Sequence, residues 1–214
     1  MKKAALLVIA AFWINIAPAQ DAKAKEILDK LAAKTQSYST LSADFTVTLD
    51  NKKDKVKDSQ TGKLILKDNM FKIKMRDSDI YSNGKQRWTY LKESNEVNLQ
   101  NINPNDPNVL SNPSKLFNGY LNDFKYAYKG VKKEGGIDVL QVDLYPKNLK
   151  AAYSLIKLYI NGSSGLPKSI AYSGKDGMTY TINFTKITPN LPISNSEFSF
   201  NERAYPGVEV IDLR

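Results

Sequence analysis

Residues 41–49 read LSADFTVTL, and this stretch decides the fold because apolar and polar side chains alternate along it. A period of two places Phe45, Val47 and Leu49 on one face of a β-strand and two threonines on the other. The same period returns in two stretches that follow, with apolar positions at Leu64 and Leu66, and then at Phe71, Ile73 and Met75. Each stretch predicts a half-buried strand with one buried, apolar face and one solvent-exposed, polar face.

Upstream of this strand the spacing becomes helical. Within residues 21–38, Ala24, Ile27, Leu28 and Leu31 recur every three or four positions, while lysines and acidic residues fill half of the others. That spacing predicts an amphipathic helix with one apolar side.

A second helix is expected after a polar loop. Residues 101–112 are rich in Asn, Pro and Asp, a composition typical of a surface loop. Pro113 then opens a helical stretch, in which the residues that share a face are Leu116, Phe117, Tyr120, Leu121 and Phe124.

Strands and turns make up most of the remaining chain. Asn83-Gly84 predicts a type I′ turn between strands at 80–81 and 87–91, because both residues tolerate positive φ. Further strands are expected over 96–100, 137–144, 154–161, 168–172, 178–187 and 198–200. The predicted fold is mainly β with α insertions: an incomplete, unclosed antiparallel β-barrel of about ten to eleven strands, with helices covering its concave face.

The composition excludes several kinds of site. The 214 residues include neither cysteine nor histidine, which excludes disulfides, thiolate metal sites and histidine-dependent catalysis. A carboxylate pair acting on cell-envelope sugars stays open as an enzymatic alternative, but Asp and Glu are scattered at turns. The formal net charge is +9, and its lysines alternate with apolar residues along strands, which favours a solvated face over binding to nucleic acid or to an anionic membrane surface. We therefore expect no enzyme, no cofactor and no metal.

The N-terminus has the pattern of a cleavable signal peptide. Lys2 and Lys3 precede an apolar run over 4–16, which is shorter than the roughly 20 residues that a membrane span needs. Small residues at the end of that region predict cleavage after about Ala19, and no cysteine follows that could be acylated. We expect a signal peptide over 1–19 and a single soluble domain over 20–214.

The apolar face of the predicted sheet has two interpretations. The helices either pack on it as an ordinary core or form a removable lid over a cavity that holds an apolar ligand. Large side chains suit both arrangements, so periodicity alone does not separate them.

Four stretches, in order, resemble a known family: YSTLSADF at 38–45; GKLILK at 62–67 with MFKI at 70–73; DIYSNGKQRWTY at 79–90; and FSF at 198–200 with PGVEVID at 206–212. Together they resemble the outer-membrane lipoprotein carrier, or LolA, family over essentially the whole mature chain. The resemblance implies a periplasmic carrier that takes acylated lipoproteins from an inner-membrane release complex to the outer membrane. An outer-membrane acceptor is a further expected partner, and the protein is expected to be a monomer.

A sensing function on the same fold is the alternative. Regulators that bind lipid or lipoprotein signals resemble this chain too, but they usually carry an additional C-terminal domain, which is not expected after Arg214.

The resemblance also implies positions for a lipid site. The wall and the central lid are expected to comprise Phe45, Val47, Leu64, Leu66, Phe71, Ile73, Trp88, Tyr90, Leu116, Phe117, Ile182 and Phe184. The first helix would add Ile27, Leu28 and Leu31 as a lid. Family members often carry an arginine that latches the lid where this chain has Asp68. A carboxylate cannot donate hydrogen bonds as arginine does, so the latch is expected to be rebuilt or absent.

Overall fold

The computed structural model describes residues 17–51, 56–103, 106, 112–113, 115, 120–175 and 177–214. Two helices and six strands make up the first part of the described chain: α1 (Ala17–Gln36), β1 (Leu41–Asn51), β2 (Val56–Lys67), β3 (Met70–Met75), β4 (Ser78–Ser82), β5 (Gln86–Leu91), β6 (Glu96–Asn101) and α3 (Tyr120–Asp123). The second part contains β7 (Phe124–Glu134), β8 (Ile137–Pro146), β9 (Tyr153–Asn161), β10 (Pro167–Gly174), β11 (Thr179–Pro189), the 3-10 turns η1 (Asn195–Phe198) and η2 (Glu202–Ala204), and β12 (Glu209–Asp212).

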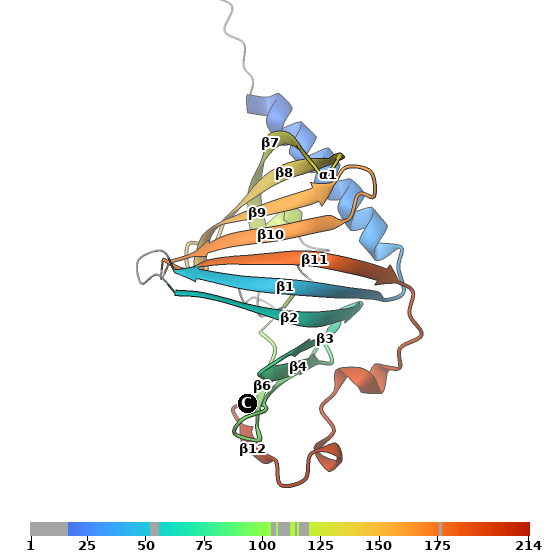
Figure 1. Cartoon of the computed structure of the whole chain (residues 1–214), viewed down its shortest axis with the longest axis vertical. Coiled ribbons are helices and arrows are strands. Elements are labelled where there is room, and N and C mark those ends of the chain that lie inside the picture. The colour runs from blue at the N-terminus through green and yellow to red at the C-terminus, as the bar shows by residue number, and fades with distance from the viewer. Residues whose placement is uncertain are drawn as a thin grey trace, which may run out of the picture.

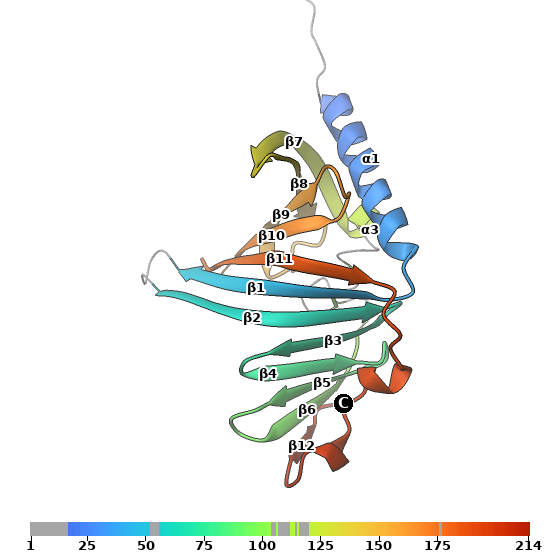
Figure 2. The ribbon, with the colours of Figure 1, turned by 45° about the vertical axis from the view of Figure 1, so that its right-hand side comes forward.

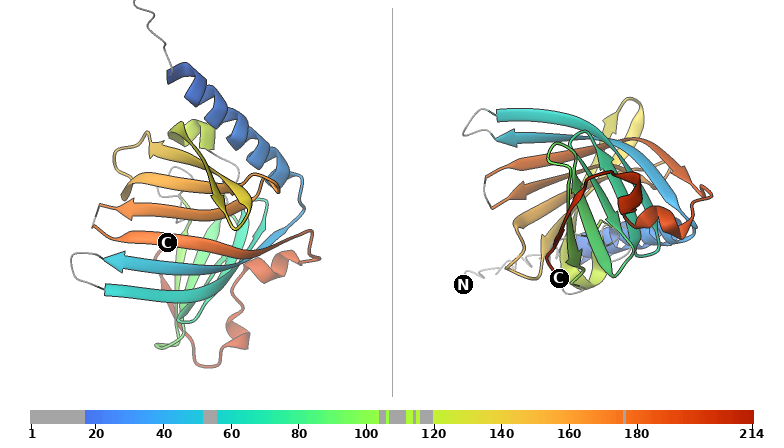
Figure 3. Two further views of the ribbon diagram at one scale, coloured as in Figure 1. Left: turned by 45° about the horizontal axis from the view of Figure 1, so that its top comes forward. Right: turned by 90° about the horizontal axis from the view of Figure 1, so that it is seen from below.

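All twelve strands belong to one curved sheet (Figures 1 and 2). Their order is β12-β6-β5-β4-β3-β2-β1-β11-β10-β9-β8-β7, so β1 lies in the middle and pairs with both β2 and β11. The sheet does not close, and it curls around α1 when seen from below (Figure 3). The prediction of a mainly β, unclosed barrel with a helix on its concave face is confirmed.

The first helix forms where it was predicted, with shifted ends. It begins at Ala17 rather than at residue 21, and it ends at Gln36 rather than at Tyr38. Ala24, Leu28 and Leu31 are almost completely buried against the sheet. The spacing of the apolar residues therefore identified the correct face of the helix.

The two edges of the sheet are built differently. At one edge β12 runs parallel to β6, so the predicted all-antiparallel sheet is wrong at this pair. At the other edge β7 pairs with β8, and its register shifts between Tyr128 and Gly130, where Gly130 has φ of 110°. A residue other than glycine would be strained there. The β7 edge is therefore bent by a bulge rather than straight.

Several local predictions were wrong. Phe124 opens β7 instead of continuing a helix, and Phe198 lies in η1 instead of a strand. The turn at Asn83-Gly84 is not type I′, because only Gly84 has positive φ; the Asn83 side chain accepts hydrogen bonds from the amides of Lys85 and Gln86 instead. Both β7 and β12 were missed, which accounts for the low predicted number of strands.

Candidate functional site

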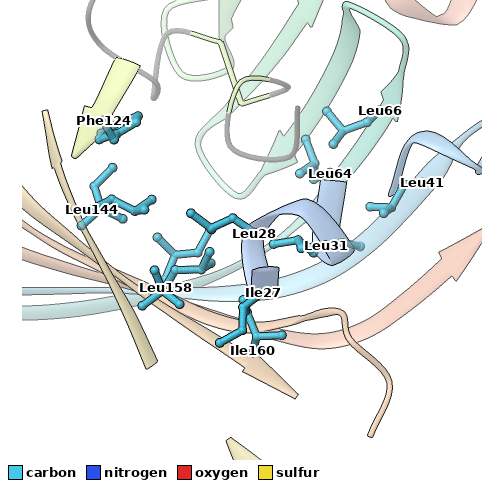
Figure 4. Packing of buried hydrophobic residues seen from close by; sticks show 14 of the residues in the cluster. Ile27, Leu28, Leu31, Leu41, Leu64, Leu66, Phe124, Leu144, Leu158 and Ile160 are labelled. Carbon is cyan, nitrogen blue, oxygen red and sulfur yellow. The ribbon is translucent and has the colours of Figure 1, made fainter. Parts of the chain in front are cut away.

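The candidate site is the concave face, where α1 lies on apolar side chains of the sheet. Ile27, Leu28 and Leu31 belong to one cluster with wall residues from both sides of β1. In Figure 4, Ile27 and Leu28 lie beside Leu158 and Ile160 of β9, while Leu31 lies toward Leu41 of β1 and Leu64 of β2. One apolar helix face therefore bridges strands that are far apart in the sequence.

The predicted wall residues divide into a covered set and a half-exposed set. The covered set, at most 8% exposed, consists of Phe45, Leu64, Leu66 and Phe71. The half-exposed set, which we call the open row, consists of Val47, Ile73, Ile182 and Phe184. Both sets belong to the same cluster as α1, so the structure brings together eight of the twelve predicted lipid-binding positions.

Strand register places the open row on one surface. Val47 pairs with Ile182 and Phe45 pairs with Phe184 across β1 and β11, and paired residues share a face. Across β2 and β3, Leu64 pairs with Ile73. The side chains of the open row contain only hydrocarbon and are half-buried, so they can bury additional apolar surface from a ligand.

An aromatic row crosses the same cluster near one end of the strands. Phe124 and Tyr153 stack with centroids 6.5 Å apart, and Tyr153 meets Tyr172 edge-on at 6.2 Å. Tyr172 in turn stacks on Tyr180 at 4.7 Å, with an interplanar angle of 8°. The sequence prediction missed this row, although Tyr172 and Tyr180 both lie in stretches that were identified as strands. Tyr172 pairs with Ile156 and Tyr180, so register alone would have placed it inside.

Trp88 and Tyr90 do not join the wall, which corrects their predicted position. Tyr81 pairs with Trp88, and Tyr90 pairs with Val97, on the face opposite Ile80 and the open row. There Tyr81, Tyr90, Val97 and Phe200 form a second cluster, with Trp88, Tyr205 and Val208 packed against it. We call this the C-terminal aromatic cluster. The physical reason is the alternation of side chains along a strand: β5 presents Arg87, Thr89 and Leu91 to the concave side, so Trp88 and Tyr90 lie on the other side.

The concave face turns polar at β5. The pairing row that starts at Phe71 continues through Ser82 and Arg87 to Gln100. Arg87 Nη2 donates a hydrogen bond to Gln100 Oε1 at 2.6 Å, and both residues line a cavity of about 90 Å³. The surface suited to an acyl chain therefore ends before β5.

The outer side of α1 is charged and mostly satisfied within the helix. Lys23 and Lys30 both pair with Glu26, at 2.9 and 2.7 Å, and Lys25 pairs with Asp29 at 2.7 Å. The hydrogen bonds from Lys30 and Lys23 lower the pKa of Glu26 to about 2, so this carboxylate stays ionised at neutral pH. These charges keep the outer side of the helix in water and leave its apolar side for the sheet.

Within the part of the chain that the structure describes, no helix combines the length and apolar character needed to cross a membrane. In that same part, acidic residues do not gather in a group of three or more that could hold a metal ion.

Comparison with known proteins decides the family. Residues 36–201, most of the chain, match the family model for the outer membrane lipoprotein carrier protein LolA. The chain belongs to the LolA family. The resemblance expected from the four sequence stretches is therefore confirmed. Among curated proteins, no sequence match was found.

Solved structures share the LolA-like fold at low identity. An uncharacterized conserved protein from Thermus thermophilus gives a TM-score of 0.58 at 11% identity, covering 89% of this chain and 99% of that one. A domain assigned to outer membrane lipoprotein sorting in Vibrio parahaemolyticus gives 0.53 at 11%, covering 86% and 99%. A DUF1329 family protein from Desulfovibrio piger gives 0.52 at 11%, covering 87% and 99%. At this identity the likeness concerns the fold alone.

Asp68, where a departure from the family pattern was expected, lies beside the end of α1. Asp68 lies in the β2–β3 turn with φ of 51°, and it lines a cavity of about 110 Å³ with residues 35, 36 and 38 at the helix end. Leu116 and Phe117, the predicted central lid of this LolA-family chain, lie outside the described residues. A rebuilt or absent latch therefore stays a prediction.

Proposed function

We propose that this LolA-family protein is a soluble periplasmic carrier that binds the acyl chains of lipoproteins released from the inner membrane and delivers them to the outer membrane. The observation that carries the proposal is the open row of Val47, Ile73, Ile182 and Phe184, which is apolar, half-buried and part of the same cluster as the helix that covers other apolar side chains of this face. Family membership supports the class of cargo.

The energetics of acyl chains require such a carrier. Three chains of about 16 carbons contain on the order of 45 methylene groups, each costing ~0.8 kcal/mol to expose to water. A lipoprotein leaving a bilayer unescorted would pay most of that cost. An apolar concave face removes part of it, and partial shelter is enough because the cargo must later be released.

The cover over this face is suited to exchange. Helix α1 meets the sheet through Ala24, Ile27, Leu28 and Leu31, while its three ion pairs lie within the helix. Lys34 Nζ donates to Ser164 O at 2.6 Å near the C-terminal end of the helix. An acyl chain offers the sheet the same kind of contact as the helix does. The helix can therefore be displaced by cargo without breaking its own charge pairs.

The test is formation of a soluble complex with a triacylated lipopeptide. Size-exclusion chromatography of the mature protein with the lipopeptide should give a one-to-one complex. Ile182→Asp places a charge on the open row, and we expect it to weaken binding at least about tenfold, because a buried charge against hydrocarbon costs more than about 1.4 kcal/mol. Transfer of the lipopeptide from the complex to acceptor vesicles then tests delivery.

Asn183→Asp is the matched control, since Asn183 is the next residue on β11 and is exposed on the opposite face. It should bind as the wild type does. Circular dichroism establishes that both variants fold, and Ile182→Ser replaces Ile182→Asp if the latter does not. Equal binding by the folded Ile182 and Asn183 variants, or no complex with the wild type, contradicts the proposal.

A further inference from the structure

The loop between β8 and β9, residues 147–152, is held firmly at both of its ends. Lys147 donates its amide to Asp123 O at 2.9 Å and its Nζ to Asn122 O at 3.0 Å. At the other end, Lys175 donates its amide to Ala152 O at 2.9 Å. Ala151 is almost completely buried. The loop therefore has a defined shape and a fixed place on the sheet.

Leu149 projects into solvent from this anchored loop. Its side chain is 86% exposed, compared with 53% for Val131 and for Leu213, the next most exposed large apolar residues among those described. Lys175 Nζ donates to the carbonyl oxygen of Leu149 at 2.5 Å, so the main chain is held while the side chain is left in water. Burying a leucine side chain away from water is favourable, and this loop leaves that contribution unused.

Three lysines lie close to the exposed leucine in the sequence or in space. Lys147 and Lys150 flank it in sequence and are exposed, and the ammonium group of Lys175 reaches its carbonyl. Asp123, also exposed, contributes the nearby negative charge, since its main chain contacts Lys147. The loop residues 147–152 themselves contain no acidic side chain. An apolar tip with exposed lysines on the same loop suits the boundary of a lipid layer, where hydrocarbon lies beneath anionic headgroups.

The position of the loop connects it to the site. Strands β8 and β9 meet there, at the end of the sheet where β10 also ends and β11 begins (Figure 1). Tyr153, two residues beyond Ala151, belongs to the aromatic row that runs through Tyr172 to Tyr180. Tyr172 and Tyr180, which are only partly buried, suit a boundary between water and lipid, because their rings are apolar and their hydroxyls are polar. The apolar concave face reaches this end of the sheet.

We propose that this end of the molecule docks on an anionic lipid surface, with Leu149 inserted at the headgroup boundary and Lys147, Lys150 and Lys175 facing lipid phosphates. The inference rests on the proposed function, because docking here brings the concave face next to the bilayer that supplies or receives the acyl chains. Each lysine near such a surface contributes roughly 1 kcal/mol, and salt weakens the attraction.

The experiment is flotation of the purified full-length mature protein with vesicles of phosphatidylcholine alone or mixed with phosphatidylglycerol. The wild type should float with the anionic vesicles and not with the neutral ones, and added salt should release it. Leu149→Asp should lower the partition coefficient about tenfold. Lys150→Gln, whose exposed side chain does not anchor the loop, should lower it about fivefold.

Leu213→Asp is the matched control, because Leu213 is also exposed and precedes an arginine but follows β12 at the far edge of the sheet. It should float as the wild type does. Equal losses for Leu149→Asp and Leu213→Asp overturn the proposal, as does wild-type binding that ignores lipid charge. If the wild type forms dimers instead of binding vesicles, and Leu149→Asp abolishes those dimers, the docking proposal is overturned. The occupant of this surface would then be a second copy of the chain.

All variants are also tested for the soluble lipopeptide complex without vesicles. If docking fails while the complex forms, only the docking inference is lost. If the complex fails in the wild type, the carrier proposal is lost instead.

Discussion

The protein has two apolar clusters on opposite faces of one sheet, and they are covered in different ways. The C-terminal aromatic cluster is covered by the chain that follows β11, whose Phe200 and Tyr205 rings lie 4.7 Å apart against Tyr90. Polar contacts fix this cover: Tyr81 and Tyr205 share a hydrogen bond between their hydroxyls at 3.0 Å. The concave cluster is covered by α1 through hydrocarbon contacts and keeps a half-exposed open row.

The difference separates a permanent cover from an exchangeable one. A segment held by ring packing and hydrogen bonds loses specific contacts when it leaves, and water or lipid does not replace all of them. Helix α1 is held mainly by apolar contacts, with one exposed hydrogen bond from Lys34 to Ser164 O, so it loses little if another apolar surface takes its place. Apolar patterning alone shows that both faces of the sheet must be shielded from water. The polar contacts of the C-terminal segment show that its cover is the more firmly attached of the two.

The largest expected effect tests the fixed cover. Phe200→Ala removes a ring that contacts Tyr81, Tyr90 and Tyr205 and leaves a cavity, so the free energy of unfolding should fall by about 3–4 kcal/mol. Urea unfolding measures the loss. Lipopeptide binding by the folded protein should stay unchanged. If the folded variant no longer binds lipopeptide, the C-terminal aromatic cluster contributes to binding, and Trp88 and Tyr90 belong to the binding site after all.

A smaller effect is expected within the concave face. A Cβ atom at Gly62 would lie 2.5 Å from Phe45 Cζ and 2.9 Å from Lys74 O, so Gly62→Ala should destabilise the protein by about 2 kcal/mol. It should also push the Phe45 ring toward the open row and weaken lipopeptide binding. Adding Phe45→Leu should recover part of the stability, because the ring leaves while the Lys74 carbonyl stays. If the double variant is no more stable than Gly62→Ala, the ring is not the obstacle.

The smallest effect concerns one attachment of the C-terminal segment. Lys72 Nζ donates to Glu197 Oε2 at 2.6 Å and lies 5.2 Å from the centroid of Tyr81. This hydrogen bond and the charge of Lys72 lower the pKa of Glu197 below its ordinary value of 4.5. The stabilisation is therefore complete above pH ~4.5 and is lost as the pH falls through the lower, folded-state pKa.

Glu197→Gln should remove this contribution. Because Glu197 is largely exposed, the loss at pH 7 should be under about 1 kcal/mol. Urea unfolding at neutral and acidic pH should show a shallower decline for the variant than for the wild type. Parallel declines would place the pH dependence at another carboxylate.

The sequence predicted the strands better than it predicted their faces. Alternation at 41–49 and 62–75 identified β1, β2 and β3, and their apolar side lies inside as expected. In β5 the family resemblance implied wall positions for Trp88 and Tyr90, and alternation could not test this because it does not state which face is concave. Pairing with β4 identifies the concave face of β5, because Tyr81 pairs with Trp88 while Ile80 pairs with Thr89.

The missed strands have a common cause. β7 carries four lysines and β12 is short, mostly exposed and charged at both ends, so neither shows the apolar alternation of an inner strand. Edge strands bury less apolar surface than inner strands, and they often carry charged side chains that oppose pairing with another chain. The aromatic row was missed for another reason: Phe124, Tyr153, Tyr172 and Tyr180 come from four strands, and only the strand order brings them together.

The bulged β7 edge affects how readily this protein aggregates at high concentration. An unclosed sheet exposes unpaired amides and carbonyls, which invite strand-by-strand growth into fibrils. Here the kink at Gly130 and the charges of Lys129, Lys132 and Lys133 oppose such growth, and the other end of the sheet is capped by a four-residue parallel strand. The molecule can therefore keep an unclosed sheet with a partly exposed apolar face at high concentration without polymerising through its edges.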